Sequence, residues 1–202
     1  MIQSEFFFGG VIYIDLRGYS DLVEDKPLKN IAKIIYEYQV NIARKINKLF
    51  PPDNIMKIEY MGDGILVIIK DYSKKTDNYS AIKEGNFELK LYDSADVLRE
   101  YMVSFITKVQ KNHKSIISLD KLDFGMGISY SNIYYHESED SRKVFFGTCL
   151  NRAAKIGDAM NKDKNNIGID LQLFEKIENC KSIKANASYT RTNLGRVEYV
   201  HL

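Results

Sequence analysis

The stretch GGVIYIDLRGYS, residues 9–20, is the most informative part of the sequence. Its apolar run, residues 11–14, follows two glycines and is typical of a short buried strand. Asp15 ends this predicted strand, and ligand sites in proteins tend to lie at the carboxyl ends of sheet strands. The stretch therefore predicts a central strand with a candidate site at its end.

The next predicted elements along the chain are a long helix and a hairpin. Ser20 can cap a first helical turn. Apolar residues then recur every three or four positions over residues 28–49, which predicts one buried face of a long helix that ends before Pro51 and Pro52. Residues 57–69 predict two strands joined by a tight turn at Gly62-Asp63-Gly64.

The second half of the chain alternates between helix-like and strand-like patterns. Residues 70–93 are polar and irregular and are interpreted as a loop or insertion. A second amphipathic helix is expected from Asp93 or Ser94 to about residue 112. The remaining predicted elements are a strand at 122–135, a short strand at 144–146, a helix at 150–160, a short strand at 167–169, a helix at 171–177 and a strand at 197–200.

This element order predicts an α+β fold. The first six elements follow the order βαββαβ of a ferredoxin-like sheet, and an αβαβ extension follows at the C-terminal end. A length of 202 residues suits one domain, so residues 1–202 are expected to form a single unit.

Composition excludes several classes of protein. The formal net charge is only +2, because 29 basic residues nearly balance 27 acidic ones, so a dedicated nucleic-acid binder is not expected. The chain contains no apolar run long enough to span a membrane and no secretory leader at its N-terminus, which predicts a cytoplasmic protein. Cys149 and Cys180 have no metal-binding spacing, and we interpret Cys149 as a buried apolar residue rather than a reactive thiol.

Two carboxylates define the candidate site. In a ferredoxin-like sheet the first strand lies beside the hairpin, so Asp15 and Asp63 are expected to converge at one edge. Two carboxylates that face one point repel each other unless a cation lies between them, and oxygen ligands of this kind suit two-metal catalysis. Each residue also has a simpler explanation, because Gly-Asp-Gly is a common turn and Asp15 could cap a helix.

A third motif covers residues 145–155, FFGTCLNRAAK. Asn151 and Lys155 are four residues apart and therefore share one face of the predicted helix. Small residues on the opposite face allow this helix to pack closely on the sheet, so that Asn151 and Lys155 face a cleft. The alternative is an ordinary solvent-exposed polar face.

Taken in order, these motifs resemble those of the class III adenylyl and guanylyl cyclases. The segment DLRGYS at 15–20 is similar to that family's D-I-R-G-F-T, and MGDG at 61–64 is similar to its glycine-aspartate hairpin. GMGIS at 125–129 resembles its strand ending in G-I-H, and residues 147–155 resemble G-x-x-V-N-x-A-x-R. The four motifs span residues 11–156 in the family's order.

The resemblance implies a role for each matched residue. Asp15 and Asp63, with the carbonyl of Leu16, would hold two Mg²⁺ or Mn²⁺ ions. The helix start after Gly18, including Tyr19, would offer backbone N–H groups to the phosphates of a nucleoside triphosphate. Asn151 would orient the ribose.

Lys155 would stand where the family carries an arginine that stabilises charge on the α-phosphate. A lysine keeps that positive charge but loses the two-pronged geometry of a guanidinium. Arg152 is not expected to replace it, because it lies about 100° round the helix from Lys155. The family works as a head-to-tail homodimer in which each site takes residues from both chains.

The residues that select the base depart from both purine-specific branches. Glu59 stands where adenylyl cyclases carry lysine and guanylyl cyclases carry glutamate, and Val144 stands where these branches carry aspartate or cysteine. Tyr60 could narrow the base pocket. This combination resembles the stand-alone pyrimidine cyclases of the Pycsar anti-phage systems, which implies conversion of UTP to cyclic UMP. The alternatives are a guanylate or adenylate cyclase, or a decayed module that binds nucleotide without turning it over.

Overall fold

The computed structural model places one long strand at the centre of the sheet. Strand β1 (Gln3–Arg17) pairs antiparallel with β3 (Gly64–Lys70) on one side and with β4 (Asp123–Glu137) on the other. Strand β2 (Ile55–Met61) forms the expected hairpin with β3. The structure describes residues 3–20, 28–73, 86–112, 121–180, 190–194 and 197–201.

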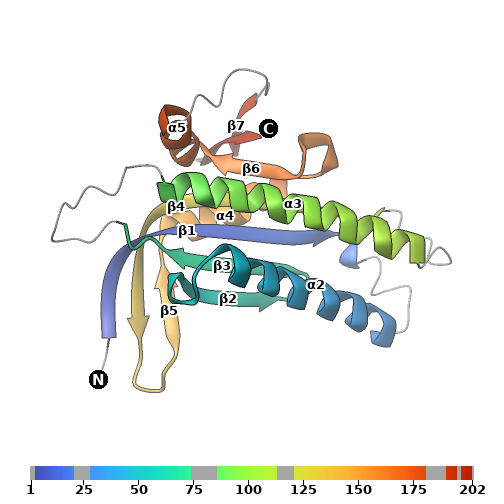
Figure 1. Ribbon diagram of the computed structural model, residues 1–202, viewed down its shortest axis with the longest axis horizontal. Coiled ribbons are helices and arrows are strands. Elements are labelled where there is room, and N and C mark those ends of the chain that lie inside the picture. Colours follow the sequence, from blue (N-terminus) through green and yellow to red (C-terminus); the bar gives the residue numbers. More distant parts are fainter. Residues whose placement is uncertain are drawn as a thin grey trace.

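The sheet order confirms the predicted α+β fold. These four strands run β2-β3-β1-β4, the order of a ferredoxin-like sheet, and β6, β8 and β7 continue the sheet beyond β4 (Figure 1). Strand β6 (Ile167–Asp170) lies parallel to β4, while β8 (Val197–His201) lies antiparallel to β6. Short strand β5 (Lys143–Phe146) pairs only with the far end of β4.

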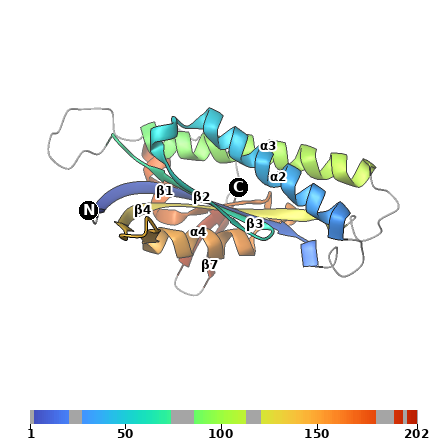
Figure 2. The same cartoon turned by 90° about the horizontal axis from the view of Figure 1, so that it is seen from below.

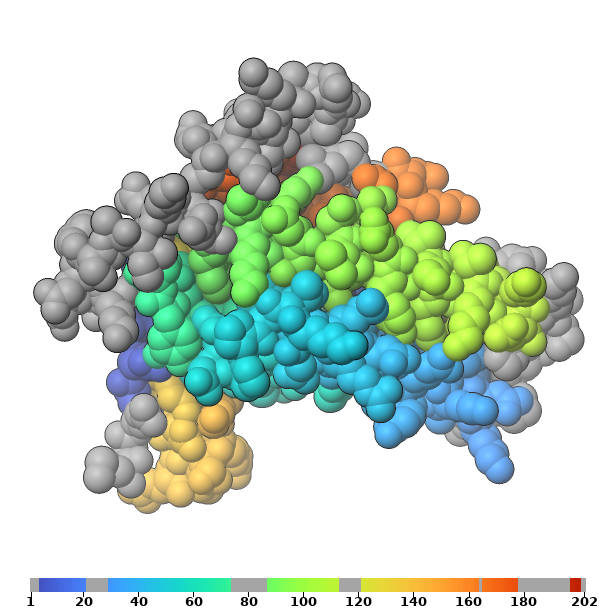
Figure 3. Space-filling model, in the orientation of Figure 1, coloured from blue at the N-terminus to red at the C-terminus, as the bar shows by residue number. Residues whose placement is uncertain are grey.

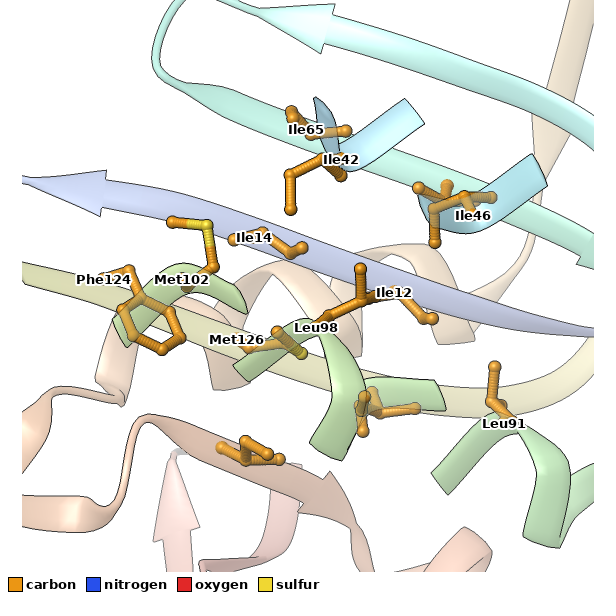
Figure 4. Packing of buried hydrophobic residues seen from close by; sticks show 14 of the residues in the cluster. Ile12, Ile14, Ile42, Ile46, Ile65, Leu91, Leu98, Met102, Phe124 and Met126 are labelled. Atoms are coloured by element: carbon orange, nitrogen blue, oxygen red, sulfur yellow. The ribbon is translucent and has the colours of Figure 1, made fainter. Parts of the chain in front are cut away.

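Two long helices cover one face of this sheet. Helices α2 (Leu28–Leu49) and α3 (Asn86–Asn112) lie side by side on that face (Figure 2). Isoleucines and larger apolar residues fill the space between these helices and the sheet (Figure 4). Fully buried members of this cluster include Ile12, Ile14, Ile42, Ile46, Ile65, Leu91, Leu98, Met102 and Met126.

The opposite face carries helix α4 (Thr148–Ala159), as Figure 2 shows. Its small residues allow close packing, because a Cβ on Gly127 of β4 would lie 1.9 Å from the carbonyl oxygen of Ala153. Buried Cys149 lies in the same interface, and burial raises the pKa of its thiol to about 11. It is therefore a buried apolar residue, as expected.

Two boundaries differ from the sequence-based expectations. Strand β1 begins at Gln3 rather than after the glycines, because β4 pairs with it along all fifteen residues. Helix α3 begins at Asn86 rather than at Asp93 or Ser94. Ser94 is not a cap: its hydroxyl donates a hydrogen bond to the carbonyl of Lys90 one turn earlier, at 2.5 Å.

The C-terminal extension contains one strand more than the predicted αβαβ. Helix α5 (Leu171–Cys180) follows β6 as expected, but β7 (Thr190–Leu194) precedes the final strand. β7 is an edge strand of the sheet, and its short polar sequence carries little of the apolar signal that marks buried strands.

Figure 3 shows α2 and α3 side by side across the front of the molecule, with the β4–β5 hairpin projecting below them. In the described part of the chain, no helix is both long and apolar enough to cross a membrane.

Candidate active site

The two aspartates lie at the same edge of the sheet. Asp15 stands near the end of β1, opposite Gly64 of β3 and Gly125 of β4. Asp63 lies in the turn between β2 and β3, and its backbone carbonyl accepts a hydrogen bond from the N–H of Leu16 at 3.4 Å. The hairpin turn is thus attached to the end of β1, and the structure brings both carboxylates to one place.

The electrostatics of Asp15 reflect this proximity. Burial, then the charge of Asp63, raise the pKa of Asp15 from its ordinary 3.8 to about 6, although the Arg17 guanidinium acts in the opposite direction. Asp158 of α4 adds a smaller upward effect. A carboxylate whose charged form is disfavoured in this way gains most from a nearby cation.

Tyr13, Asp15 and Arg17 form a row on one face of β1, because alternate residues of a strand share a face. The Tyr13 hydroxyl donates to Oδ1 of Asp15 at 3.5 Å, and Arg17 Nη1 lies 3.4 Å from Oδ2. Burial and the charge of Asp15 raise the pKa of Tyr13, so its hydroxyl keeps its proton and remains a donor. The end of the α4 helix packs on this row, since a Cβ on Gly157 would lie 2.6 Å from the Tyr13 ring.

Two glycines with positive φ shape the loops at this edge. Gly62 has φ +68° in the hairpin turn, where its carbonyl accepts a hydrogen bond from Gln39 Nε2 of α2 at 2.8 Å. Gly18 has φ +76° directly after β1 and allows the chain to turn into a helical segment that begins at Tyr19. The continuation of that predicted phosphate-binding turn, residues 21–27, lies outside the described residues.

Asn151 and Lys155 share one face of α4, as their spacing predicted, and Asp158 continues the same stripe. All three residues are exposed, as the alternative of a solvent-exposed polar face expects. Within the described chain, neither Asn151 nor Lys155 has a hydrogen bond or ion pair with Asp15 or Asp63.

The Arg152 side chain interacts with Asp170 and Gln172 rather than with Asp15 or Asp63. Its Nη1 lies 3.2 Å from the buried carboxylate of Asp170 and 2.9 Å from Oε1 of Gln172. The Asp170 carboxylate also accepts the Ser129 hydroxyl at 2.6 Å. Arg152 therefore fixes α4 to the strands beneath it, in agreement with its predicted exclusion from the site.

The three predicted base-reading residues lie on two strands of the sheet. Glu59 shares the sheet face of Asp15 and forms an ion pair with Lys57 at 2.9 Å, whereas the half-exposed Tyr60 points to the opposite face. Val144 lies on β5. It pairs with His136 of β4, which pairs with Ser4, eleven residues from Asp15 along β1.

Oxygen ligands for a cation are present at the edge of the sheet. The carboxylates of Asp15 and Asp63 match the preference of Mg²⁺ and Mn²⁺ for oxygen, and the mutual repulsion recorded in the raised pKa of Asp15 fits a site built around positive charge. Among the described residues there is no group of three or more acidic, histidine or cysteine side chains that could hold a metal ion.

No protein-family model matches the chain, and no curated protein matches its sequence. Solved structures match its fold over nearly the whole length. They include the adenylyl cyclase CyaB from P. aeruginosa, with TM-score 0.71 and 15% identity over 98% of this chain and 95% of the other. The chain has the fold of an adenylyl or guanylyl cyclase domain.

Two further structures with the cyclase fold support this assignment. The guanylyl cyclase Cya2 matches with TM-score 0.71 and 17% identity over 98% of this chain and 92% of its own. The guanylate cyclase domain of RhGC from Catenaria anguillulae, solved in complex with GTP, matches with TM-score 0.63 and 11% identity over 98% of both chains. At these identities the likeness concerns the cyclase fold alone.

Three residues of this cyclase-fold edge were not predicted from the sequence. Tyr13 and Arg17 flank Asp15 at positions two before and two after it, so the two-residue period of a strand was a signal that could have found them. Asp158 follows Lys155 by three positions, which places it on the same helix face. The close approach of α4 to β1 that makes these residues relevant depends on tertiary packing.

Proposed function

We propose that this protein is a nucleotide cyclase that converts a nucleoside triphosphate to a 3′,5′-cyclic nucleotide and pyrophosphate. The observation that carries the proposal is the convergence of Asp15 and Asp63 at the end of β1, on a cyclase fold. Fold alone fixes no activity, so the proposed cyclase activity rests on these two carboxylates at this position.

Asp15, Asp63 and the backbone carbonyl of Leu16 would hold two divalent cations, Mg²⁺ or Mn²⁺. When bound, such ions offset the charge of the triphosphate and lower the pKa of the attacking 3′-hydroxyl. The Tyr13 hydroxyl, at 3.5 Å from Oδ1, orients the Asp15 carboxylate. The N–H groups after Gly18, at Tyr19 and beyond, would receive the phosphates.

The reaction forms one bond and breaks another at the α-phosphorus. The 3′-oxygen of the ribose loses its proton to solvent and attacks the α-phosphorus, and the bond from that phosphorus to the bridging oxygen of pyrophosphate breaks in line. Asn151 would hold the ribose in position for this attack, and the ammonium of Lys155 would stabilise charge on the α-phosphate. The protein thus contributes positioning and electrostatic stabilisation.

Two copies of the chain are needed to assemble such a site. Among the described residues, Asn151 and Lys155 have no hydrogen bond or ion pair with the aspartates of their own chain, and Val144 pairs through His136 with Ser4, eleven residues from Asp15 along β1. Large apolar side chains are exposed on the strands that would meet a partner: Tyr60, Met61, Val144 and Phe146. A two-fold homodimer would cover them and place Asn151 and Lys155 of one chain over Asp15 and Asp63 of the other.

The base is proposed to be a pyrimidine, with UTP as substrate and cyclic UMP as product. Val144 offers no hydrogen-bonding group, while Glu59 lies on the same sheet face as Asp15 with its carboxylate paired to Lys57. This pair matches neither purine-specific branch of the class III cyclases. The resemblance to the Pycsar cyclases extends the proposal to signalling in anti-phage defence.

The decisive experiment is a product assay with four substrates. The purified protein is incubated with equimolar ATP, GTP, CTP and UTP and with Mn²⁺ or Mg²⁺, and the products are identified by mass spectrometry. Cyclic UMP as the main product is expected. Cyclic GMP as the main product would show that Glu59 reads guanine and would refute the pyrimidine assignment.

The same assay separates the cyclase from a nucleotide-binding module. Retained binding of a triphosphate with no cyclic product under any condition would refute the enzymatic proposal. Lys155, which replaces arginine, is the residue that would then explain the loss, and the Lys155→Arg variant tests this in the same assay.

A further inference from the structure

Arg17 touches both halves of the candidate site in one chain. Its Nη1 lies 3.4 Å from Oδ2 of Asp15, and its Nη2 donates a hydrogen bond to the carbonyl of Gly157 at 2.8 Å. Gly157 lies in the last turn of α4, the helix that carries Asn151 and Lys155. A single guanidinium therefore links the metal-binding strand to the helix with the ribose- and phosphate-binding residues.

The surrounding backbone is shaped to allow this bridge. Gly125 of β4 faces the bridge, and a Cβ at this position would lie 2.2 Å from the Gly157 carbonyl oxygen and 3.1 Å from Arg17 Nη2. Any side chain at 125 would therefore displace α4 from the guanidinium. The planar fork of an arginine can serve two acceptors at once, whereas a lysine ammonium lacks this geometry.

The guanidinium also borders a cleft. Arg17 lines this open cleft of about 690 Å³ together with Asp158, Met160 and Lys162 at the end of α4. A shift of the guanidinium into the cleft would release the Asp15 carboxylate and keep the hydrogen bond to Gly157. The Asp15 contact is the weaker of its two interactions, since the pair is 3.4 Å apart and Arg17 is partly exposed.

We propose that Arg17 is a positioning residue that anchors α4 through Gly157 and competes with a divalent cation for the carboxylate of Asp15. This inference rests on the proposed function. In a two-fold dimer, Asp15 serves one site while α4 of the same chain serves the other. Arg17 would then connect the metal-binding half of one site to the ribose- and phosphate-binding half of the second.

Removal of Arg17 should have opposite effects on metal binding and on turnover. A positive charge beside Asp15 opposes a cation at that carboxylate, so its loss should strengthen Mn²⁺ binding. The same loss releases the end of α4, and misplaced Asn151 and Lys155 should slow the reaction. A general loss of folded structure would weaken both properties, so this opposition distinguishes positioning from a merely structural role.

The test compares the full-length parent with Arg17→Met and Arg17→Lys. Mn²⁺ binding is measured without nucleotide, from the electron paramagnetic resonance signal of free Mn²⁺, and turnover is measured at saturating Mn²⁺. For Arg17→Met we expect the Kd for Mn²⁺ to fall about 3- to 10-fold and kcat to fall about tenfold with little change in KM. Arg17→Lys keeps the charge, so its Kd should stay near that of the parent while its kcat falls.

Arg142→Gln is the matched control, because this guanidinium pairs with exposed Asp140 on the distant β4–β5 turn. It should leave both quantities unchanged. Unchanged or weaker Mn²⁺ binding in Arg17→Met, with kcat equal to that of the parent, would overturn the inference. If the parent forms no cyclic nucleotide, the proposed function fails instead, and the Mn²⁺ measurement still decides whether Arg17 competes for Asp15.

Discussion

At the scale of single residues, the site is defined by a carboxylate in an unfavourable environment. Burial and Asp63 raise the pKa of Asp15 to about 6, even with Arg17 nearby. In the unfolded chain this carboxyl group has its ordinary pKa of 3.8. Without a cation, the ionised carboxylate therefore lowers the stability of the folded state at neutral pH.

Asp15→Asn should consequently stabilise the metal-free protein while abolishing turnover. A raised carboxyl pKa favours folding below pH 4, and this contribution is lost as the pH rises through about 6. The shift corresponds to a gain of about 3 kcal/mol at most for the asparagine variant at pH 7.5, and almost none at pH 4. Urea unfolding at both pH values measures the difference, with exposed Asp53→Asn as control. An asparagine variant that is less stable than the parent at pH 7.5 would contradict this account.

Lys155 tests whether charge near the α-phosphate matters in the transition state. Loss of the ammonium in Lys155→Ala should reduce kcat about 100-fold, whereas Lys155→Arg should keep or raise it because the guanidinium fork suits a phosphate. Steady-state kinetics with saturating Mn²⁺ measures both. Exposed Lys48→Ala on α2 is the control for loss of one surface charge. Parent-like activity in Lys155→Ala would remove the proposed role of this position.

At the scale of secondary structure, the sequence was most informative where an element has one strongly apolar face. Helix α2 (Leu28–Leu49) matches the predicted bounds, because its apolar stripe begins and ends with the helix itself. Helix α3 was predicted to start late, since buried Glu88 and the polar residues around it interrupt the apolar pattern there. The first turn of α3 is stabilised by Phe87 and Leu91, which pack in the core. The local sequence pattern does not predict this packing.

The candidate site, like the secondary structure, could be predicted only in part from the sequence. Asp15 and Asp63 could be placed at one edge because the strand order of a ferredoxin-like sheet brings the first strand beside the hairpin. The packing of α4 against Tyr13 could not be foreseen, because it depends on Gly127 of β4 and Gly157 of α4, two elements that are distant in the sequence. The functional roles of Gly18, Glu59 and Asn151 remain predictions.

The close packing of α4 on β4 can be tested by substitution. Gly127→Ala should destabilise the protein by about 2 kcal/mol or more, because the new methyl group meets the Ala153 backbone at 1.9 Å and backbone cannot move aside easily. At Gly10, the three atoms nearest to a new Cβ all belong to the Leu91 side chain, which can move more easily than backbone. Gly10→Ala is therefore the milder matched control. The free energy of unfolding and the activity per folded molecule are measured for both variants. Equal losses in both would show that the close packing of α4 on β4 has no specific role.

At the scale of the whole molecule, the proposed site would be shared between two chains. Asp63→Ala and Asn151→Ala homodimers should each be nearly inactive. Mixed dimers should contain one site with both lesions and one intact site, so the pool should recover about a quarter of the parent activity if subunits exchange at random. Unfolding and refolding the mixture ensures exchange. No recovery after verified exchange would mean that each chain carries a complete site of its own.

The uninterrupted pairing of β1 with β4 also has a consequence during synthesis. The register joins Gln3 to Glu137 and Arg17 to Asp123, so the partner of the first strand leaves the ribosome more than a hundred residues later. Until then the nascent chain presents the segment FFFGGVIYI without its β4 neighbour, and such apolar, β-prone segments are prone to intermolecular association. Slow translation of the region before β4 should therefore increase the demand for chaperones, and co-expression of chaperones that bind nascent chains should raise the soluble yield.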